Sequence, residues 1–512
     1  RYNYLRVEMG ESMVNFSERM QCEALKDRVM SADDAAIYIK SGMTVGTSGF
    51  TPTGYPKAVP EALAKRVQDD KNFKINLFTG ASVGKALDGD LGALGVIDRR
   101  MPYQTNQNTR KKLNDREIRY SDIHLSHFPQ EVRYGFYGKV DVAIIEAAKI
   151  TEDGQVVLTT SIGASPAFCQ VADVVIIEIN TRKPLELEGI HDIYQLEDPP
   201  NRKPIPLVKP DDRIGSKYLT IEPDKIKAIV FTDKDDDPIA FAPVCQNSQA
   251  IAEHLIRFFE KEVALGRLPE SLLPLQSGVG SVANAVLKGF SDSSFKNLVF
   301  YSEVIQDNVL DLLDEGTFRF ASGTSLTLSP EGFSRLYSNL EHYKENIVLR
   351  PMEISNNPEI IRRIGSITIN TAIEVDIFGN VNSTHIMGRN MMNGIGGSGD
   401  FTRAGYLSIF TTPSVAKGGD ISSIVPMVSH VDHTDHDVNV IVTEQGLADL
   451  RGLSPSERAE LIIENCVHPD YRPELVAYLK EAKNSPGHTP HIMNRALGWH
   501  ERYMNTGSMK TN

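Results

Sequence analysis

The chain has 512 residues, of which 41% are hydrophobic and 24% charged, and its formal net charge is −13 at pH 7. This balance is typical of a folded globular protein and excludes a disordered chain, and the length predicts two domains. The sequence has no long Lys/Arg run and no uninterrupted apolar stretch of bilayer length. We therefore expect neither a nucleic-acid partner nor a membrane span.

The four cysteines form no CxxC pair, which favours a reducing compartment. Residues 1–20 contain no apolar core of signal-peptide length, so we expect a cytoplasmic protein. Because the chain begins with arginine, a removed targeting segment and a mitochondrial-type compartment stay open as alternatives.

Short runs rich in Val and Ile alternate with longer helical patterns along the chain. In order, these runs are 44–46, 74–78, 140–145, 174–179, 227–231 and 298–301. The run at 174–177 is apolar on both faces, as strands are when helices cover both sides of a largely parallel sheet. The alternation predicts an α/β protein.

The second half of the sequence repeats the first in outline. Two pairs of segments match in the same order, namely 142–146 with 371–374 and 174–178 with 440–444. Such a repeat predicts two related α/β domains with a boundary near residues 210–240, and we divide the chain into residues 1–225 and residues 226–512.

A glycine motif stands at 278–283, where Gly278-Val279-Gly280-Ser281-Val282-Ala283 matches the GxGxxA fingerprint of dinucleotide-binding proteins. Its glycines would let the backbone approach a phosphate, and the helix that follows would direct N–H groups at it. A tight strand-to-helix turn without ligand is the alternative. No acidic residue stands clearly about 20 residues on to hold a ribose, so a nicotinamide-dependent oxidoreductase is only partly supported.

Two carboxylates follow apolar runs in the second half. Glu303 comes just after 298–301 and before a helical pattern at 309–313, and Glu444 ends the run that begins at 440. The carboxyl ends of strands carry catalytic groups in α/β enzymes, where a carboxylate acts as nucleophile, base or metal ligand. For Glu303 the alternative is a helix N-terminal carboxylate, stabilised there by the helix dipole.

Residues 393–400 form a glycine-dense loop, and residues 430–436 hold three histidines and two aspartates. The loop suits an oxyanion hole of backbone N–H groups, with a plain flexible loop as the alternative. The histidine segment fails the HxHxDH pattern of zinc hydrolases because Val431 stands where that pattern needs histidine. We therefore predict surface or hydrogen-bonding histidines and no metal site.

Several of these segments together resemble a known family. They are 276–286, 301–307, 353–359, 392–401 and 442–452, and further likeness runs from 48–57 to 468–471. They resemble the acetyl-CoA hydrolase/transferase family, the class I CoA-transferases, and are closest to its succinyl-CoA:acetate branch. The resemblance covers nearly the whole chain. It implies two related open α/β domains of the CoA-transferase (NagB/RpiA-like) fold, commonly assembled as a homodimer.

The resemblance also assigns roles to individual residues. It implies that Glu303 is the nucleophile, that Asn356 and the Gly397 N–H form the oxyanion hole, and that Glu444 orders the catalytic glutamate. The residues that it implies for CoA binding are Gly278, Val279, Gly280, Ser281, Val282, Ile373, Asn393, Gly397 and Lys417. Acyl-CoA and small carboxylates would be the substrates, with no tightly bound cofactor and no metal.

The expected reaction is transfer of CoA from succinyl-CoA to acetate, or the reverse, by a ping-pong mechanism through acyl-glutamyl anhydride and glutamyl-CoA intermediates. An acyl-CoA hydrolase would use the same glutamate and stays an alternative. Propionate, butyrate or hydroxybutyrate transferases would share the same glutamate and glycine loops. A nicotinamide-dependent oxidoreductase and a non-catalytic CoA-binding or structural protein are the alternatives from other classes.

Overall fold

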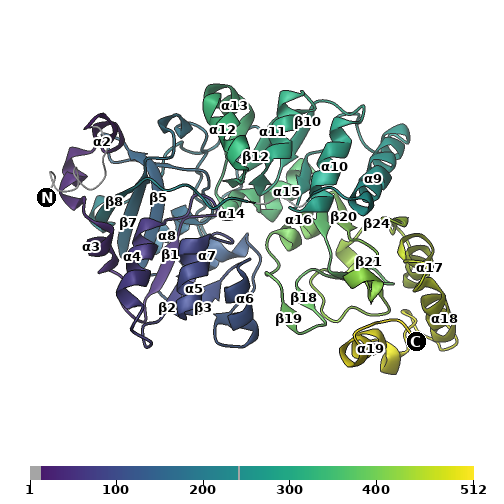
Figure 1. The fold of residues 1–512 in the computed structure, drawn as a ribbon. Coiled ribbons are helices and arrows are strands. Elements are labelled where there is room, and N and C mark those ends of the chain that lie inside the picture. Colours follow the sequence, from purple (N-terminus) through teal and green to yellow (C-terminus); the bar gives the residue numbers. More distant parts are fainter. Residues whose placement is uncertain (1–12, 240–242, 512) are drawn as a thin grey trace. The chain divides into compact units, whose positions relative to one another are not determined.

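The computed structural model describes residues 13–239 and 243–511, which divide into two compact units (Figure 1). The first unit comprises Arg1–Ala240, Tyr301–Leu310 and Phe320–Ile360, and the second comprises Phe241–Phe300, Asp311–Arg319 and Ile361–Asn512. Between residues 300 and 361 the division passes through helices and strands and does not fall in the loops between them. The predicted domain boundary between residues 225 and 226 stays a prediction.

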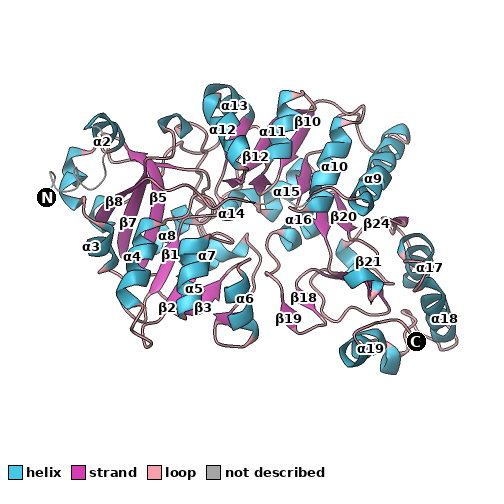
Figure 2. Ribbon diagram, viewed as in Figure 1, coloured by secondary structure: helices cyan, strands magenta, loops and turns pink. Residues whose placement is uncertain are grey.

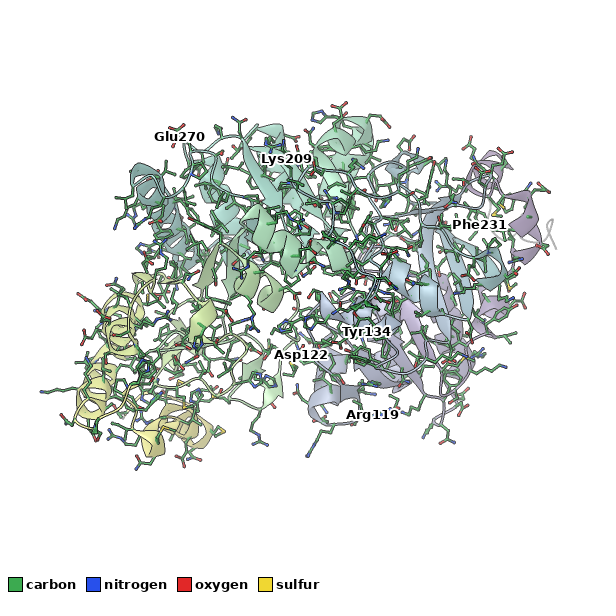
Figure 3. The ribbon with its side chains drawn as sticks, turned by 180° about the vertical axis from the view of Figure 1, so that it is seen from behind. Arg119, Asp122, Tyr134, Lys209, Phe231 and Glu270 are labelled. Carbon is green, nitrogen blue, oxygen red and sulfur yellow. The ribbon has the colours of Figure 1, made fainter. Side chains whose placement is uncertain are left out.

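The first unit is built on a sheet with the strand order β4-β3-β2-β1-β5-β7-β8, in which β6 pairs with β5. Its strands are β1 (Thr44–Thr47), β2 (Ile75–Phe78), β3 (Ile97–Met101), β4 (Arg119–Tyr120), β5 (Val142–Ile150), β6 (Val156–Leu158), β7 (Val174–Asn180) and β8 (Ile226–Thr232). All pairs along this order are parallel, and β6 runs antiparallel to β5. Phe231, near the end of β8, is labelled in Figure 3.

Helices pack against these strands, as Figure 2 shows. They are α2 (Met13–Arg19), α3 (Ala32–Ala36), α4 (Ala58–Val67), α5 (Asp90–Leu94), α6 (Gln107–Asn114), α7 (His127–Arg133) and α8 (Ser165–Val171). The short turns of helix are η1 (Glu23–Arg28), η2 (Lys85–Gly89), η3 (Leu185–Leu187) and η4 (Pro223–Lys225). α4 begins where Glu178, on β7, accepts hydrogen bonds from the N–H groups of residues 57–59. A buried carboxylate thus satisfies the otherwise free donors of that helix start.

Two later segments of the chain also belong to the first unit. They contain β11 (Val304–Ile305), β13 (Ser325–Leu326), α12 (Pro330–Ser338), α13 (Leu340–Asn346), β14 (Ile347–Leu349) and α14 (Met352–Ser355). β11 pairs with β13, and β14 pairs with the end of β12 (Phe318–Gly323), both in parallel. These segments carry Glu303 and Asn356.

The second unit has the strand order β10-β9-β15-β20-β24-β25, in which only β25 is antiparallel to its neighbour. Its elements are α9 (Gln246–Ala264), β9 (Leu275–Ser277), α10 (Ser281–Ser291), β10 (Leu298–Tyr301), α11 (Asp307–Asp314), α15 (Pro358–Ile364), β15 (Ile367–Thr371), α16 (Ser398–Ala404), β20 (Leu407–Thr411), β24 (Val440–Thr443) and β25 (Gly446–Asp449). β10, α11, β12 and α15 cross the division between the units.

A second layer of small sheets and three helices completes this unit. The small strands are β16 (Glu374–Asp376), β17 (Val381–Asn382), β18 (His385–Ile386), β19 (Asn390–Met391), β21 (Val415–Ala416), β22 (Ile421–Ser422) and β23 (Ile424–Val425). The helical elements are η5 (Lys417–Gly419), η6 (Asp435–Asp437), α17 (Pro455–Cys466), α18 (Arg472–Ala482), η7 (Met493–Arg495) and α19 (Gly498–Thr506). One buried apolar cluster, which includes Phe378, Phe410, Tyr471 and Trp499, joins these parts into a core.

The predicted α/β class is confirmed, since each apolar run singled out in the sequence contains or overlaps a strand. β7 is buried along almost its whole length, as expected for a strand with apolar side chains on both faces.

Candidate active site

Glu303 lies in the short link between β10 and β11, past the carboxyl end of β10. Its carbonyl oxygen accepts hydrogen bonds from Thr324 N at 2.7 Å and Ser325 N at 3.1 Å. The pairing of β11 with β13 therefore fixes the backbone at Glu303. α11 begins only at Asp307, whose own carboxylate occupies the first turn of the helix. The alternative of a helix N-terminal carboxylate thus fits Asp307 better than Glu303.

Asn356 is the side chain that contacts the Glu303 carboxylate. Its Nδ2 donates a hydrogen bond to Glu303 Oε1 at 2.6 Å. Asn356 is fully buried at the C-terminal end of α14, and within the described residues its Oδ1 has no hydrogen-bond partner. Because an ionised carboxylate can only accept, the amide must present its nitrogen to Glu303. The structure thus brings together two of the predicted site residues.

The surroundings of Glu303 alter its acidity. Burial raises the pKa of the Glu303 carboxyl from its ordinary 4.5 to about 7, and the hydrogen bond from Asn356 opposes that rise. The side chain still keeps partial access to solvent. A poorly solvated carboxylate that a ligand can reach is a stronger nucleophile than a hydrated one, so this environment suits covalent chemistry.

The predicted phosphate loop lies between β9 and α10, in the second unit. Gly280 has φ of +118°, a conformation that favours glycine, and it precedes the first residue of α10, Ser281. The positions where side chains of Gly278 and Gly280 would extend are open space, and 55% of Val279 is exposed. No side chain of the N-cap residue satisfies the helix N–H groups. An open loop followed by an uncapped helix start can accept a phosphate-bearing ligand.

The glycine-dense loop before α16 is also in the second unit. Gly394 and Gly396 have positive φ, which explains glycine at these two positions, and Gly397 is buried at the helix N-cap. The Ser398 hydroxyl donates to Ile395 O at 2.8 Å and braces the loop. The Gly397 N–H belongs to a different unit from Asn356, so their joint role as an oxyanion hole stays a prediction.

Glu444 follows β24 and is held by several donors. Ser414 N donates to Oε2 at 2.8 Å, and the Ser414 hydroxyl and Gln445 Nε2 both donate to Oε1. Ser414 was missed by the sequence reasoning, because a single serine after a proline carries no motif. The expected ordering of Glu303 by Glu444 stays a prediction, since the two residues belong to different units.

Three further predicted CoA contacts lie in the second unit. Ile373 is half-buried just before β16, Asn393 is the first residue of the glycine-dense loop, and Lys417 is exposed at the start of η5. Lys417 has φ of +53°, which is uncommon for a residue with a side chain. Their roles stay predictions.

Residues of the histidine segment form hydrogen bonds next to the glycine-dense loop. His433 is buried, with Nε2 at 3.2 Å from the hydroxyls of both Ser383 and Ser398, and its ring packs on Phe410. Asp432 accepts a hydrogen bond from Ser383 N at 2.7 Å. Within the described parts of the chain, no cluster of His, Cys, Asp or Glu side chains has the arrangement of a metal site. The hydrogen-bonding alternative therefore describes His433.

Two comparisons bear on the class of protein. The structure of 4-hydroxybutyrate CoA-transferase from Porphyromonas gingivalis superposes with a TM-score of 0.62, is 21% identical, and covers 90% of this chain and 99% of that one. This likeness shows a shared fold.

Between residues 13 and 511, apart from 240–242, the structure contains no helix long and apolar enough to cross a membrane.

Comparison of the sequence identifies the family, whereas the structural likeness shows only the fold. Residues 13–231 match the acetyl-CoA hydrolase/transferase N-terminal domain, and residues 332–479 match the C-terminal domain of the same family. The succinyl-CoA:acetate CoA-transferase of Clostridium kluyveri is 57% identical, over 96% of this chain and 92% of that protein. The acetyl-CoA hydrolase of Schizosaccharomyces pombe is 47% identical, over 92% of this chain and 94% of that protein. The chain belongs to the acetyl-CoA hydrolase/transferase family and is an enzyme, as the sequence motifs predict.

Proposed function

We propose that this enzyme moves CoA from succinyl-CoA to acetate, or in the reverse direction, through a covalent intermediate on Glu303. The observation that carries the proposal is the 2.6 Å hydrogen bond from buried Asn356 Nδ2 to a glutamate whose pKa is raised to about 7. The similarity to the Clostridium kluyveri transferase supports the choice of succinyl-CoA and acetate.

The reaction would begin with attack of a Glu303 carboxylate oxygen on the acyl-CoA thioester carbonyl. Collapse of the tetrahedral intermediate breaks the carbon–sulfur bond and gives an acyl-glutamyl anhydride and CoA thiolate. The thiolate then attacks the glutamyl carbonyl and expels the first acid as its carboxylate. Glu303 now holds CoA as a thioester, and no proton or electron has been exchanged with another reagent.

The second half of the cycle runs the same steps with the acceptor acid. Its carboxylate attacks the glutamyl-CoA carbonyl, the thiolate leaves and returns to the acceptor's acyl carbon, and Glu303 is regenerated. A glutamyl thioester retains the energy of the donor thioester, whereas a serine ester would lose it. We therefore expect ping-pong kinetics.

Asn356 would serve both states of Glu303. In the resting enzyme its Nδ2 donates to the carboxylate. When a glutamyl carbonyl is attacked, negative charge develops on an oxygen at the same position, and the same N–H can donate to it. A donor held in place before the charge develops stabilises the transition state without reorganisation, which is the usual origin of oxyanion-hole catalysis. The predicted second donor is the Gly397 N–H.

The remaining predicted roles belong to this proposal. The open loop at 278–282, with Ile373, Asn393, Gly397 and Lys417, would bind CoA, and Glu444 would order the catalytic glutamate. Acyl-CoA and small carboxylates would be the substrates, with no tightly bound cofactor. We also propose a homodimer, a cytoplasmic location and two related domains with the boundary near residue 225.

The deciding experiment follows the covalent intermediate by mass. The enzyme is mixed with succinyl-CoA, treated with borohydride and weighed intact, beside a Glu303→Ala variant. Borohydride reduces a glutamyl thioester to an alcohol, so we expect a mass loss in the wild type that maps to Glu303 and that acetate prevents. An unchanged mass, together with normal turnover by Glu303→Ala, would overturn the proposal.

A hydrolase is the second candidate, because the Schizosaccharomyces pombe relative is an acetyl-CoA hydrolase. Water would then resolve the same glutamyl-CoA intermediate. The two candidates differ in their dependence on an acceptor acid. If CoA release from succinyl-CoA proceeds at full rate without acetate, the enzyme is a hydrolase. If CoA passes to acetate with little release of free CoA, it is a transferase.

A further inference from the structure

Tyr301 links the strand that precedes Glu303 to the turn that carries Asn356. It is the last residue of β10, is fully buried, and its hydroxyl donates a hydrogen bond to Ile354 O at 2.9 Å. Tyr301 stands two residues before Glu303, and Ile354 stands two residues before Asn356. The hydroxyl therefore bridges the two backbone segments next to the Glu303–Asn356 hydrogen bond. Burial raises the pKa of Tyr301, so its hydroxyl stays protonated as a donor.

The turn that carries Asn356 needs such support. α14 has only four residues, and a helix of one turn is unstable by itself because its ordering entropy is offset by very few hydrogen bonds. Packing already surrounds it closely, since Met352, Ile354 and Asn356 are almost completely buried. A cavity of about 10 Å³ is lined by Gly163, Pro351, Glu353 and residues of α7 and α8, among others. Packing is non-directional, so polar contacts are what can fix the orientation of α14 against its neighbours.

Two polar anchors hold the beginning of α14. Met352 N donates to Gly163 O at 3.0 Å. Arg133, the last residue of α7, donates to both carboxylate oxygens of Glu353 at 2.6 and 2.7 Å, and its side chain is 4% exposed. Tyr134, the next residue after Arg133, is labelled in Figure 3 and marks this end of α7. A bidentate arginine–carboxylate pair fixes orientation as well as distance.

The end of α14, next to Asn356, is anchored by Tyr301. Of these anchors, Tyr301 is the one that comes from the strand leading into Glu303. A change in its length or direction would therefore change the separation of nucleophile and amide directly. We infer that the Tyr301 hydroxyl is a positioning group that sets the Asn356 amide against the Glu303 carboxylate. This inference rests on the proposed function of these two residues.

The hydroxyl can be removed without leaving its acceptor unpaired. Ile354 O also accepts a hydrogen bond from Asn357 N at 3.1 Å, so the carbonyl keeps one partner in a Tyr301→Phe variant. The phenylalanine ring retains the shape of the buried side chain. The variant should therefore fold normally while it lacks the hydrogen bond from the Tyr301 hydroxyl to Ile354 O. An effect on activity can then be distinguished from an effect on overall stability.

The test compares Tyr301→Phe with Tyr120→Phe as a matched control. The Tyr120 hydroxyl lies on β4, the edge strand of the first sheet, and donates to Pro102 O at the same distance of 2.9 Å. Each substitution thus deletes one hydroxyl-to-carbonyl bond within the first unit. For both variants, kcat, KM for succinyl-CoA, the pH profile of kcat/KM and Tm are measured.

For Tyr301→Phe we expect kcat to fall about tenfold with KM for succinyl-CoA unchanged, because the substrate still binds but the amide is misplaced in the transition state. The acidic limb of kcat/KM should move to higher pH by about half a unit, because a weaker Asn356 hydrogen bond lowers the pKa of Glu303 less. Tyr120→Phe should change neither kcat nor this limb. An Arg133→Lys variant, which keeps the charge but loses the two-pronged contact, should shift the limb in the same direction.

Two other outcomes would overturn the inference. A Tyr301→Phe enzyme whose kcat and acidic limb match those of Tyr120→Phe would show that the hydroxyl does not position Asn356. A lower Tm with an unmoved acidic limb would show a structural role alone. These failures are distinct from failure of the proposed function, which would appear as retained turnover and no covalent intermediate in Glu303→Ala.

Discussion

Two glutamates follow strand ends in this protein, and their surroundings differ. Glu303 accepts one side-chain hydrogen bond within the described structure, from Asn356 Nδ2. Glu444 accepts three, from Ser414 N, the Ser414 hydroxyl and Gln445 Nε2. A carboxylate whose oxygens are well supplied with donors is stabilised where it stands, whereas one with a single donor retains lone pairs for attack. The sequence treats the two alike, whereas the structure gives their carboxylates different numbers of hydrogen-bond donors.

The largest effect is expected when Glu303, the proposed nucleophile, is removed. Glu303→Ala should lower transfer activity by at least about four powers of ten, as loss of a covalent nucleophile does in other enzymes. Initial rates of acetyl-CoA formation from succinyl-CoA and acetate measure it. Tm serves as the control for folding and should not fall. A loss of less than tenfold would place the nucleophile elsewhere.

The next effect concerns the single donor to Glu303. Asn356→Ala removes Nδ2, so the oxyanion loses one stabilising hydrogen bond, and kcat should fall by about two to three powers of ten. The acidic limb of kcat/KM should also move upward, because the hydrogen bond that lowers the pKa of Glu303 is gone. Steady-state rates between pH 5 and 9 measure both. An unchanged limb would contradict the contact between the two side chains in solution.

The raised pKa of Glu303 also predicts that the stability of the protein depends on pH. Because the pKa of Glu303 is raised from 4.5 to about 7 on folding, its contribution to stability is complete below pH 4.5 and is lost as pH rises toward 7. A Glu303→Gln variant lacks this titration. Between pH 5 and pH 8, the wild type should lose about 2 kcal/mol of unfolding free energy relative to the variant. Urea unfolding of both proteins at the two pH values measures the difference, and parallel curves would contradict a buried titrating Glu303.

The smallest expected effect tests the support of Glu444. Ser414→Ala removes one of its three donors but leaves the backbone N–H, so we expect a loss of about 1 kcal/mol in stability and a measurable fall in kcat of less than about tenfold. Thr109→Val is the matched control, because the Thr109 hydroxyl donates to Asp88 O in the first unit. It should cost similar stability and no activity. A Ser414→Ala enzyme as active as the control would argue against an active-site role for Glu444.

Much of this architecture could be predicted from the sequence because parallel strands are marked by their composition. The run at 174–179 became β7, and the run at 298–301 became β10, since a strand with apolar side chains on both faces is stable only where both faces are covered. Position relative to a strand end likewise singled out Glu303 and Glu444. What a strand-end pattern cannot specify is the number of donors around each carboxylate.

The contacts that hold the site were beyond sequence reasoning for a physical reason. Arg133 and Glu353 are 220 positions apart, and Tyr301 and Ile354 are 53 apart. Only the folded chain brings such residues together. Tyr301 lies in one of the segments that carry the resemblance, but no pattern in the sequence names its partner, and Arg133 lies in no motif. The role of Asn356 came from family resemblance, and its contact with Glu303 was then observed in the structure. The histidine segment was ambiguous because buried histidines and metal ligands share the same residue types.

The Asn356 amide that faces Glu303 is also a group that chemical ageing of proteins can change. Hydrolysis of the Asn356 amide to aspartate changes one heavy atom and leaves the volume of the side chain almost the same. It would replace the amide that faces Glu303 Oε1 at 2.6 Å by a second carboxyl, and two carboxyls this close share one proton because both cannot be ionised together. A correctly folded molecule would then lack the fixed amide donor, and we expect it to be much less active. The lifetime of the active enzyme is therefore tied to how tightly the α14 turn protects a single amide.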